Sequence, residues 1–103
     1  MLIYNTTFHV EEAVLQKFLC FVKDEYFPAV TEGGYMTRPR LVHLLGDVGE
    51  NLLGYAVMAD CPGEAIDLKK WRKETGDKLI AQLQQQFGTK VLSFSTAMKI
   101  IKE

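Results

Sequence analysis

Residues 52–59 of the chain read LLGYAVMA, and nearly every one of them is apolar. Turn-forming residues bound this stretch, at 46–51 before it and at Pro62-Gly63 after it. A short apolar run between two turns is typical of a strand that is covered on both faces. We therefore expect residues 52–59 to form a central strand of a sheet.

Three other stretches have the composition or the alternation of strands. Residues 2–10 are rich in β-branched and aromatic types, which favour a pleated surface. Residues 35–45 precede the turn, and residues 90–101 alternate apolar side chains with serine and lysine, which is the period of a sheet. Because Pro39 has no N–H to donate to a neighbouring strand, it predicts that 35–45 lies at an edge.

Two amphipathic helices separate these strands. Apolar residues recur at helical spacing over 11–26, and this helix is expected to stop near residue 26 because Pro28 disfavours helical geometry in the residue before it. The second helix is expected to follow Pro62-Gly63 and to run to residue 87. Gly88 is its predicted C-cap, and Gly76 is a point where it could divide.

The resulting order of elements, β-α-β-β-α-β, is that of a ferredoxin-like α+β fold with the first and third strands at the centre of a four-stranded antiparallel sheet. We expect one domain over residues 1–103, a length at which folding buries roughly two-thirds of the surface of the unfolded chain. Two helices cover only one face of such a sheet. Residues 52–59 place apolar side chains on both faces, so we expect a homodimer in which a partner covers the other face.

The composition restricts the partners and the compartment. Hydrophobic residues make up 48% of the chain and charged residues 24%, which is the balance of a globular protein rather than a disordered one. A formal net charge of -1 gives no field that attracts nucleic acid, and no apolar stretch approaches the ~20 residues of a membrane span. Cys20 and Cys61 lack C-x-x-C spacing, so we expect free thiols in the cytoplasm. No basic residue precedes Lys17, so the start lacks the charged region of a secretory signal.

Three short stretches resemble a known group of proteins: Ile3-Tyr4-Asn5-Thr6-Thr7, Lys23-Asp24-Glu25-Tyr26-Phe27-Pro28 and Phe87-Gly88. With them, nearly the whole chain resembles the dimeric α/β-barrel superfamily, and within it a group of short bacterial proteins known as a domain of unknown function. The resemblance implies a dimer, and relatives elsewhere in the superfamily include cofactor-independent monooxygenases and haem-degrading enzymes. In this group the residue before the apolar–proline pair is often a histidine that faces the cleft between helix and sheet. Here it is Tyr26, which weakens a haem or acid–base role.

Five polar residues are candidates for lining a ligand cleft between the helices and the sheet: Asn5, Glu25, Tyr26, His43 and Arg72. Glu25 falls on the apolar arc of the first helix. An inward Glu25 could act as a base, whereas an unwinding helix would leave it in solvent. Arg72 lies between the directions of Leu68 and Leu79, and it could hold an anionic ligand or lay its stem over the edge of the core.

Asn5 lies in a central strand, where its amide could orient a ligand or bond to a neighbouring strand. We expect His43 in the core or an interface and His9 at the surface. Two histidines without a third ligand make a poor metal site, so we expect no metal and no cofactor. Neither cysteine has a histidine nearby in the pattern that would make it a nucleophile.

Arg38 and Arg40 flank Pro39 on one face of the edge strand, where charges commonly block edge-to-edge aggregation. An anion site there is the alternative. Trp71 flanks the apolar arc of the second helix and is expected to anchor the edge of the core or an interface.

The chain has no recognisable nucleophile–base pair, metal cluster or phosphate loop. This favours a non-enzymatic dimeric module that binds a small, partly apolar ligand or mediates association. The alternative is a cofactor-independent monooxygenase- or isomerase-like enzyme that acts on a small apolar substrate in the cleft between the helices and the sheet.

Overall fold

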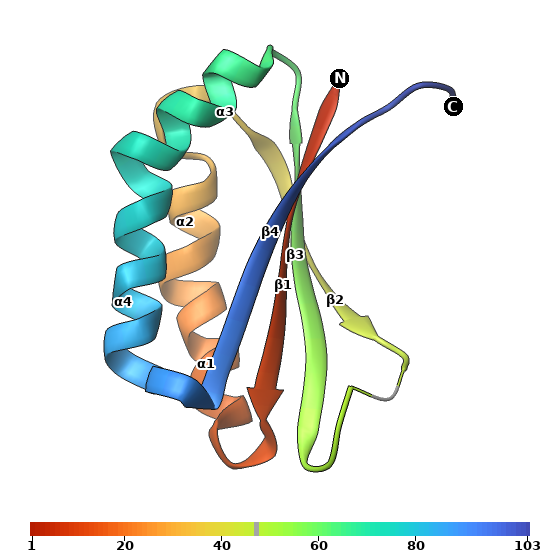
Figure 1. Cartoon of the computed structure of the whole chain (residues 1–103). Helices are drawn as coiled ribbons and strands as arrows, with labels where there is room; N and C mark the ends of the chain where they lie inside the picture. Colours follow the sequence, from red (N-terminus) through yellow and green to blue (C-terminus); the bar gives the residue numbers. More distant parts are fainter. Residues whose placement is uncertain (47) are drawn as a thin grey trace.

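A four-stranded sheet carries two long helices on one of its faces (Figure 1). The computed structural model describes residues 1–46 and 48–103. Its strands are β1 (Leu2–Glu11), β2 (Thr37–Leu44), β3 (Leu52–Cys61) and β4 (Val91–Lys99). They are arranged in the order β2-β3-β1-β4, and every neighbouring pair is antiparallel. The predicted element order and the central places of the first and third strands are confirmed.

Each helix contains a π-helical turn. The first helix comprises α1 (Leu15–Phe21), a π-turn at Val22–Tyr26 and α2 (Phe27–Val30). The second comprises α3 (Ala65–Trp71), a π-turn at Arg72–Gly76 and α4 (Asp77–Phe87). Short 3-10 turns at Glu12–Val14, Glu32–Gly34 and Gly88–Lys90 join the longer elements.

The π-turn of the first helix decides which side chains point at the sheet. A π-turn holds more residues than an α-helical turn, because its hydrogen bonds join residues five apart. The direction of Phe18 is therefore reached again at Tyr26 rather than at Glu25. Tyr26 is 2% exposed, and Glu25 lies at the surface. Regular α-helical spacing cannot anticipate this shift.

The first helix continues through Pro28 to Val30, past its predicted end near Tyr26. Pro28 is tolerated because it lies in the first turn of α2, directly after the π-turn, where the regular ladder of hydrogen bonds is already interrupted. The turn predicted at residues 46–51 includes Asp47, which lies outside the described residues.

The second helix has ends that its sequence explains. It starts at Ala65, after Glu64 and Asp67 form a capping box in which each side chain bonds the other residue's backbone N–H. It ends before Gly88, whose φ of 58° lies in the left-handed region that suits glycine. Gly76 ends the π-turn and does not break the helix.

Aromatic and aliphatic side chains fill the space between the helices and the sheet. Phe8 and Phe18 are fully buried, with ring centroids 5.1 Å apart. Trp71 is 1% exposed, and its indole Nε1 donates to the carbonyl oxygen of Ala29 at 2.9 Å. This bond joins the second helix to the first, so the two helices are fixed to each other as well as to the sheet.

Gly76→Ala should destabilise the fold, although alanine is the better helix former. An added Cβ would lie 2.7 Å from Cζ3 of Trp71, whose ring is buried and held by its bond to Ala29. We expect the free energy of unfolding in urea to fall by about 1–2 kcal/mol, the cost of overpacking reduced by the gain in helix propensity. Gly46→Ala is a control for the added methyl group alone, because Gly46 is outside the helices and nothing lies within 4 Å of its added Cβ. Equal losses in the two variants would show that the Trp71 ring does not exclude a side chain at residue 76.

Candidate functional site

Three hydroxyl groups form a chain from the core to the surface beside β4. The buried hydroxyl of Tyr26 donates to Oγ1 of Thr6 at 3.0 Å. Oγ1 of Thr6, on β1, lies 2.9 Å from Oγ of Ser95, the residue opposite it on β4. Either hydroxyl of the Thr6–Ser95 pair can be the donor, because each carries one proton and two acceptor lone pairs. Ser95, an exposed residue, forms the outer end of the chain.

Tyr26 is the donor at the buried end of this hydroxyl chain. Burial raises the pKa of Tyr26 far above its ordinary value, so its hydroxyl stays protonated and acts as a donor. The bond to Thr6 and the positive charge of Arg72 lower this pKa, but burial outweighs both. Tyr26 and Arg72, two of the five predicted cleft residues, are thus brought within electrostatic range of each other.

The other three predicted cleft residues lie elsewhere. Asn5 points to the face of the sheet opposite the helices, where its amide donates to Oγ1 of Thr7 at 3.1 Å. His43 is exposed on β2 and stacks on Tyr55 with ring centroids 4.7 Å apart, so it is not a core residue. Glu25 lines a shallow groove of about 410 Å³ on the outer side of the two helices.

β4 turns its three largest apolar side chains away from the helices. Leu92, Phe94 and Met98 lie on the face opposite the helices and are 55%, 55% and 38% exposed. Ser93, Ser95 and Ala97 face the helix side. A strand with one solvated face normally puts polar side chains on that face, so β4 is reversed. We call the sheet face without helices, formed by alternate residues of all four strands, the open face.

The middle of the open face carries small and polar side chains. Ala56 is 3% and Thr7 is 8% exposed although both lie on the open face. Each has a larger neighbour on the adjacent outer strand, since Thr7 is opposite Phe94 and Ala56 is opposite Val42. His9 is half-buried rather than exposed as predicted, and its ring meets the Phe94 ring edge-on with centroids 6.0 Å apart. The open face is therefore apolar at its β4 side and partly polar along β1.

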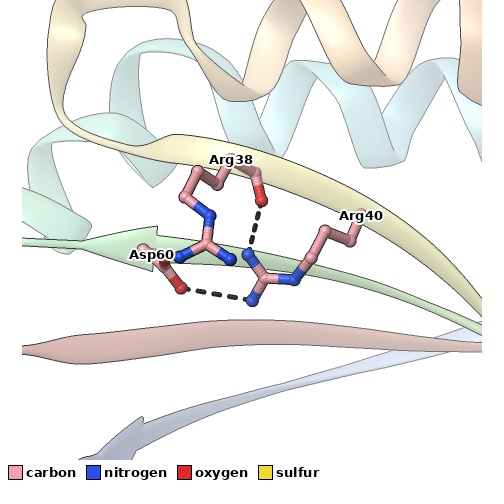
Figure 2. A network of polar contacts seen from close by, with 3 residues as sticks. All are labelled: Arg38, Arg40 and Asp60. Atoms are coloured by element: carbon pink, nitrogen blue, oxygen red, sulfur yellow. Dashed lines mark hydrogen bonds and ion pairs between the residues drawn. The ribbon is translucent and has the colours of Figure 1, made fainter.

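An ion-pair cluster lies on the open face where β3 ends (Figure 2). The side chain of Asp60 is 7% exposed and binds both arginines of β2. Nη1 of Arg38 lies 3.3 Å from its Oδ2, and Nη2 of Arg40 lies 3.2 Å from its Oδ1. Arg40 also donates to the carbonyl oxygen of Arg38 at 2.8 Å. β2 is irregular here, and Arg38 has a φ of 54°.

Sequence reasoning overlooked Asp60, Thr6 and Ser95. A signal existed for Asp60, because a carboxylate at the end of an apolar strand needs a cation, and two arginines stand on the neighbouring strand. Hydroxyl residues are common in strands, so Thr6 and Ser95 gave no comparable signal.

Both cysteines are free. Cys61 is buried at the end of β3. Within residues 1–46 and 48–103, no three side chains of histidine, cysteine, aspartate or glutamate gather as a metal site. No helix in the same residues is long and apolar enough to cross a membrane.

Tyr26→Phe should remove part of the loss of stability at alkaline pH. The folded state raises the pKa of Tyr26 above the ~10 of an unfolded chain, so folding favours the protonated form. The resulting stability is complete below pH ~10 and falls above it by up to about 1.4 kcal/mol per pH unit. Urea unfolding at several pH values between about 9 and 11 compares the two proteins, and the wild type should lose more. Parallel losses would be inconsistent with a buried Tyr26 hydroxyl.

Arg40→Met should destabilise the protein more than Arg38→Met, although both arginines bind Asp60. The side chain of Arg38 is 73% exposed, whereas that of Arg40 is 35% exposed and also holds a backbone carbonyl. We expect a loss of about 1–2 kcal/mol for Arg40→Met and below about 1 kcal/mol for Arg38→Met. Chemical denaturation measures both, and the reverse ranking would show that exposure does not set the strength of these contacts.

Solved structures share this fold at low sequence identity. HapK from Hahella chejuensis superposes with a TM-score of 0.69 and 13% identity, over 100% of this chain and 95% of that one. An ethyl tert-butyl ether d (EthD) family protein from Bacillus halodurans c-125 superposes with a TM-score of 0.66 and 11% identity, over 98% of this chain and 100% of that one. A dimeric ferredoxin-like protein from an uncultured marine organism superposes with a TM-score of 0.58 and 10% identity, over 99% of this chain and 96% of that one. Identities this low show a common ferredoxin-like fold and nothing of activity.

No curated protein matches the chain in sequence. A family model described as a domain of unknown function, DUF4286, matches residues 1–101. The match includes both helices and all four strands. The chain belongs to this family, the domain of unknown function DUF4286.

Proposed function

We propose that the protein is a non-enzymatic association module that forms an isologous homodimer through the open face of its sheet. The reversed pattern of β4 carries this proposal, because Leu92, Phe94 and Met98 face away from the helices. Removing such side chains from water contributes roughly 25 cal/mol for each Å² of apolar surface. Residues 1–103 act as one domain around a core cluster that joins the helices to the sheet. Its exposed thiol, Cys20, suits a reducing cytoplasm.

The open face has the size that a stable interface needs. Four strands about 4.8 Å apart, each of about nine residues at about 3.3 Å per residue, give a flat area of roughly 600 Å². The relief of the side chains raises the accessible area toward the ~800 Å² that each partner buries in a standard interface. A second copy is the fitting occupant, since a two-fold axis places the apolar side of one face against an equivalent surface. A dimeric protein among the similar structures agrees with this choice.

The polar groups of the open face are compatible with burial under a partner. Asn5 and Thr7 bond each other, and Asp60 is paired with Arg38 and Arg40 of the same chain. Polar groups that already have partners can be covered without the cost of unmade hydrogen bonds. The partner therefore needs no complementary charge pattern, and an identical face can serve.

Light scattering coupled to size-exclusion chromatography should give the wild type twice its chain mass of 11.7 kDa at micromolar concentration. Phe94→Glu should give the mass of one chain, because two charges would be buried near the apolar side of the interface. Ile66→Glu is the matched control. Ile66 is 56% exposed, much like Phe94 at 55%, but it lies on α3. A wild-type monomer, or a Phe94→Glu dimer, would overturn the proposal.

A further inference from the structure

We propose that the surface at the outer end of the hydroxyl chain binds the oxyanion group of a small ligand, a carboxylate or a phosphate. The residues concerned are Ser95, Ala97 and Lys99 of β4 with Arg72 of the second helix, and we call this surface the β4 flank. All four residues are exposed. The β4 flank lies on the helix side of the sheet, so the anion site does not depend on the dimer.

The strand register places three of these residues in one row. Ser95, Ala97 and Lys99 alternate along β4, opposite β1 residues whose side chains face the helices. The same row is buried on β1 at Tyr4 and Thr6 but exposed on β4. The helices therefore do not cover this part of β4. The side chain of Ala97 is small, so the space between Ser95 and Lys99 is open to a ligand.

Arg72 is brought to this row by its neighbour Trp71. The Trp71 ring packs edge-on against Tyr4, with centroids 5.6 Å apart, and Tyr4 lies opposite Ala97. Trp71 also reaches the first helix through its indole N–H. Arg72 lies about 100° further round the helix, one turn after buried Leu68, and hence toward β4 rather than toward the first helix.

The β4 flank combines one hydroxyl donor, Ser95, with two cations, Arg72 and Lys99. Tyr26 donates to Thr6. In the proposed site Thr6 in turn donates to Ser95, so that the proton of Ser95 is offered to the anion, and successive hydrogen bonds in one direction strengthen the last donor. Arg72 and Lys99 form no ion pair within residues 1–46 and 48–103. A group with two or more anionic oxygens can accept from Ser95 and from a guanidinium at once.

Tyr26 is a positioning residue in this site. It is buried and does not reach the ligand, but its bond to Thr6 occupies one acceptor site of that hydroxyl and favours the arrangement in which Thr6 donates to Ser95. Tyr26→Phe should therefore weaken anion binding by a few-fold without removing any group that touches the anion.

The test is a titration followed by ¹⁵N NMR, with sodium phosphate and sodium acetate as separate probes at constant ionic strength. We expect saturable shifts at Ser95 and Ala97, and the probe that binds more tightly identifies the head group. Ser95→Ala should weaken binding about tenfold, the effect of losing a hydrogen bond to a charged group, and Ser95→Thr should restore it. Ser95 is exposed, so its variants should fold.

Two further variants are controls for charge and for assembly. Lys17→Met removes an exposed cation from the first helix and should leave anion affinity unchanged. Phe94→Glu should also leave it unchanged, because Phe94 is on the open face, so failure of the dimer and failure of the anion site are distinguishable. Absence of saturation with both probes, or equal affinity in wild type and Ser95→Ala, would overturn the proposal.

Discussion

Two helices can cover only one face of a four-stranded sheet. The rest of this structure depends on which side chains lie on the uncovered face. On the covered face, the chain builds a core of aromatic rings in which Phe8 and Phe18 are fully buried. On the open face, the polar groups are paired within the chain and apolar side chains gather along β4. β4 contributes to both, because its serines face the helix side and its large apolar residues face the other way. The proposed dimer and the proposed anion site thus use opposite sides of the same strand.

The two π-turns adapt the helices to this sheet. Each inserted residue changes the direction of the residues that follow, so that Tyr26 reaches Thr6 and Gly76 lies against the ring of Trp71. A π-turn gives up regular hydrogen-bond geometry, and such turns often occur at functional positions. Here one of them places a hydroxyl deep in an otherwise apolar core, with Thr6 beside it as its hydrogen-bond partner.

The order of elements was predictable because residues 52–59 and the turns around them are strong local signals. Gly88 as a helix end was predictable for the same reason. The shift between Glu25 and Tyr26 was not, since one extra residue in a turn leaves no mark in an apolar pattern. Side-chain contacts between neighbouring strands could not be predicted from the sequence either. The pairs Thr6–Ser95 and Asp60–Arg40 exist only in one register, and register depends on packing over the whole sheet.

The irregular start of β2 limits how copies of this chain can assemble. Arg38 with its positive φ, the register shift that follows Thr37, and Pro39 together disrupt the regular pattern of backbone groups along that outer edge. β4, the other outer strand, has no proline and no charged residue between Val91 and Met98. Growth of a continuous sheet from molecule to molecule requires two receptive edges on every copy. A single chain has one such edge, so pairing between the sheets of single chains ends after one addition.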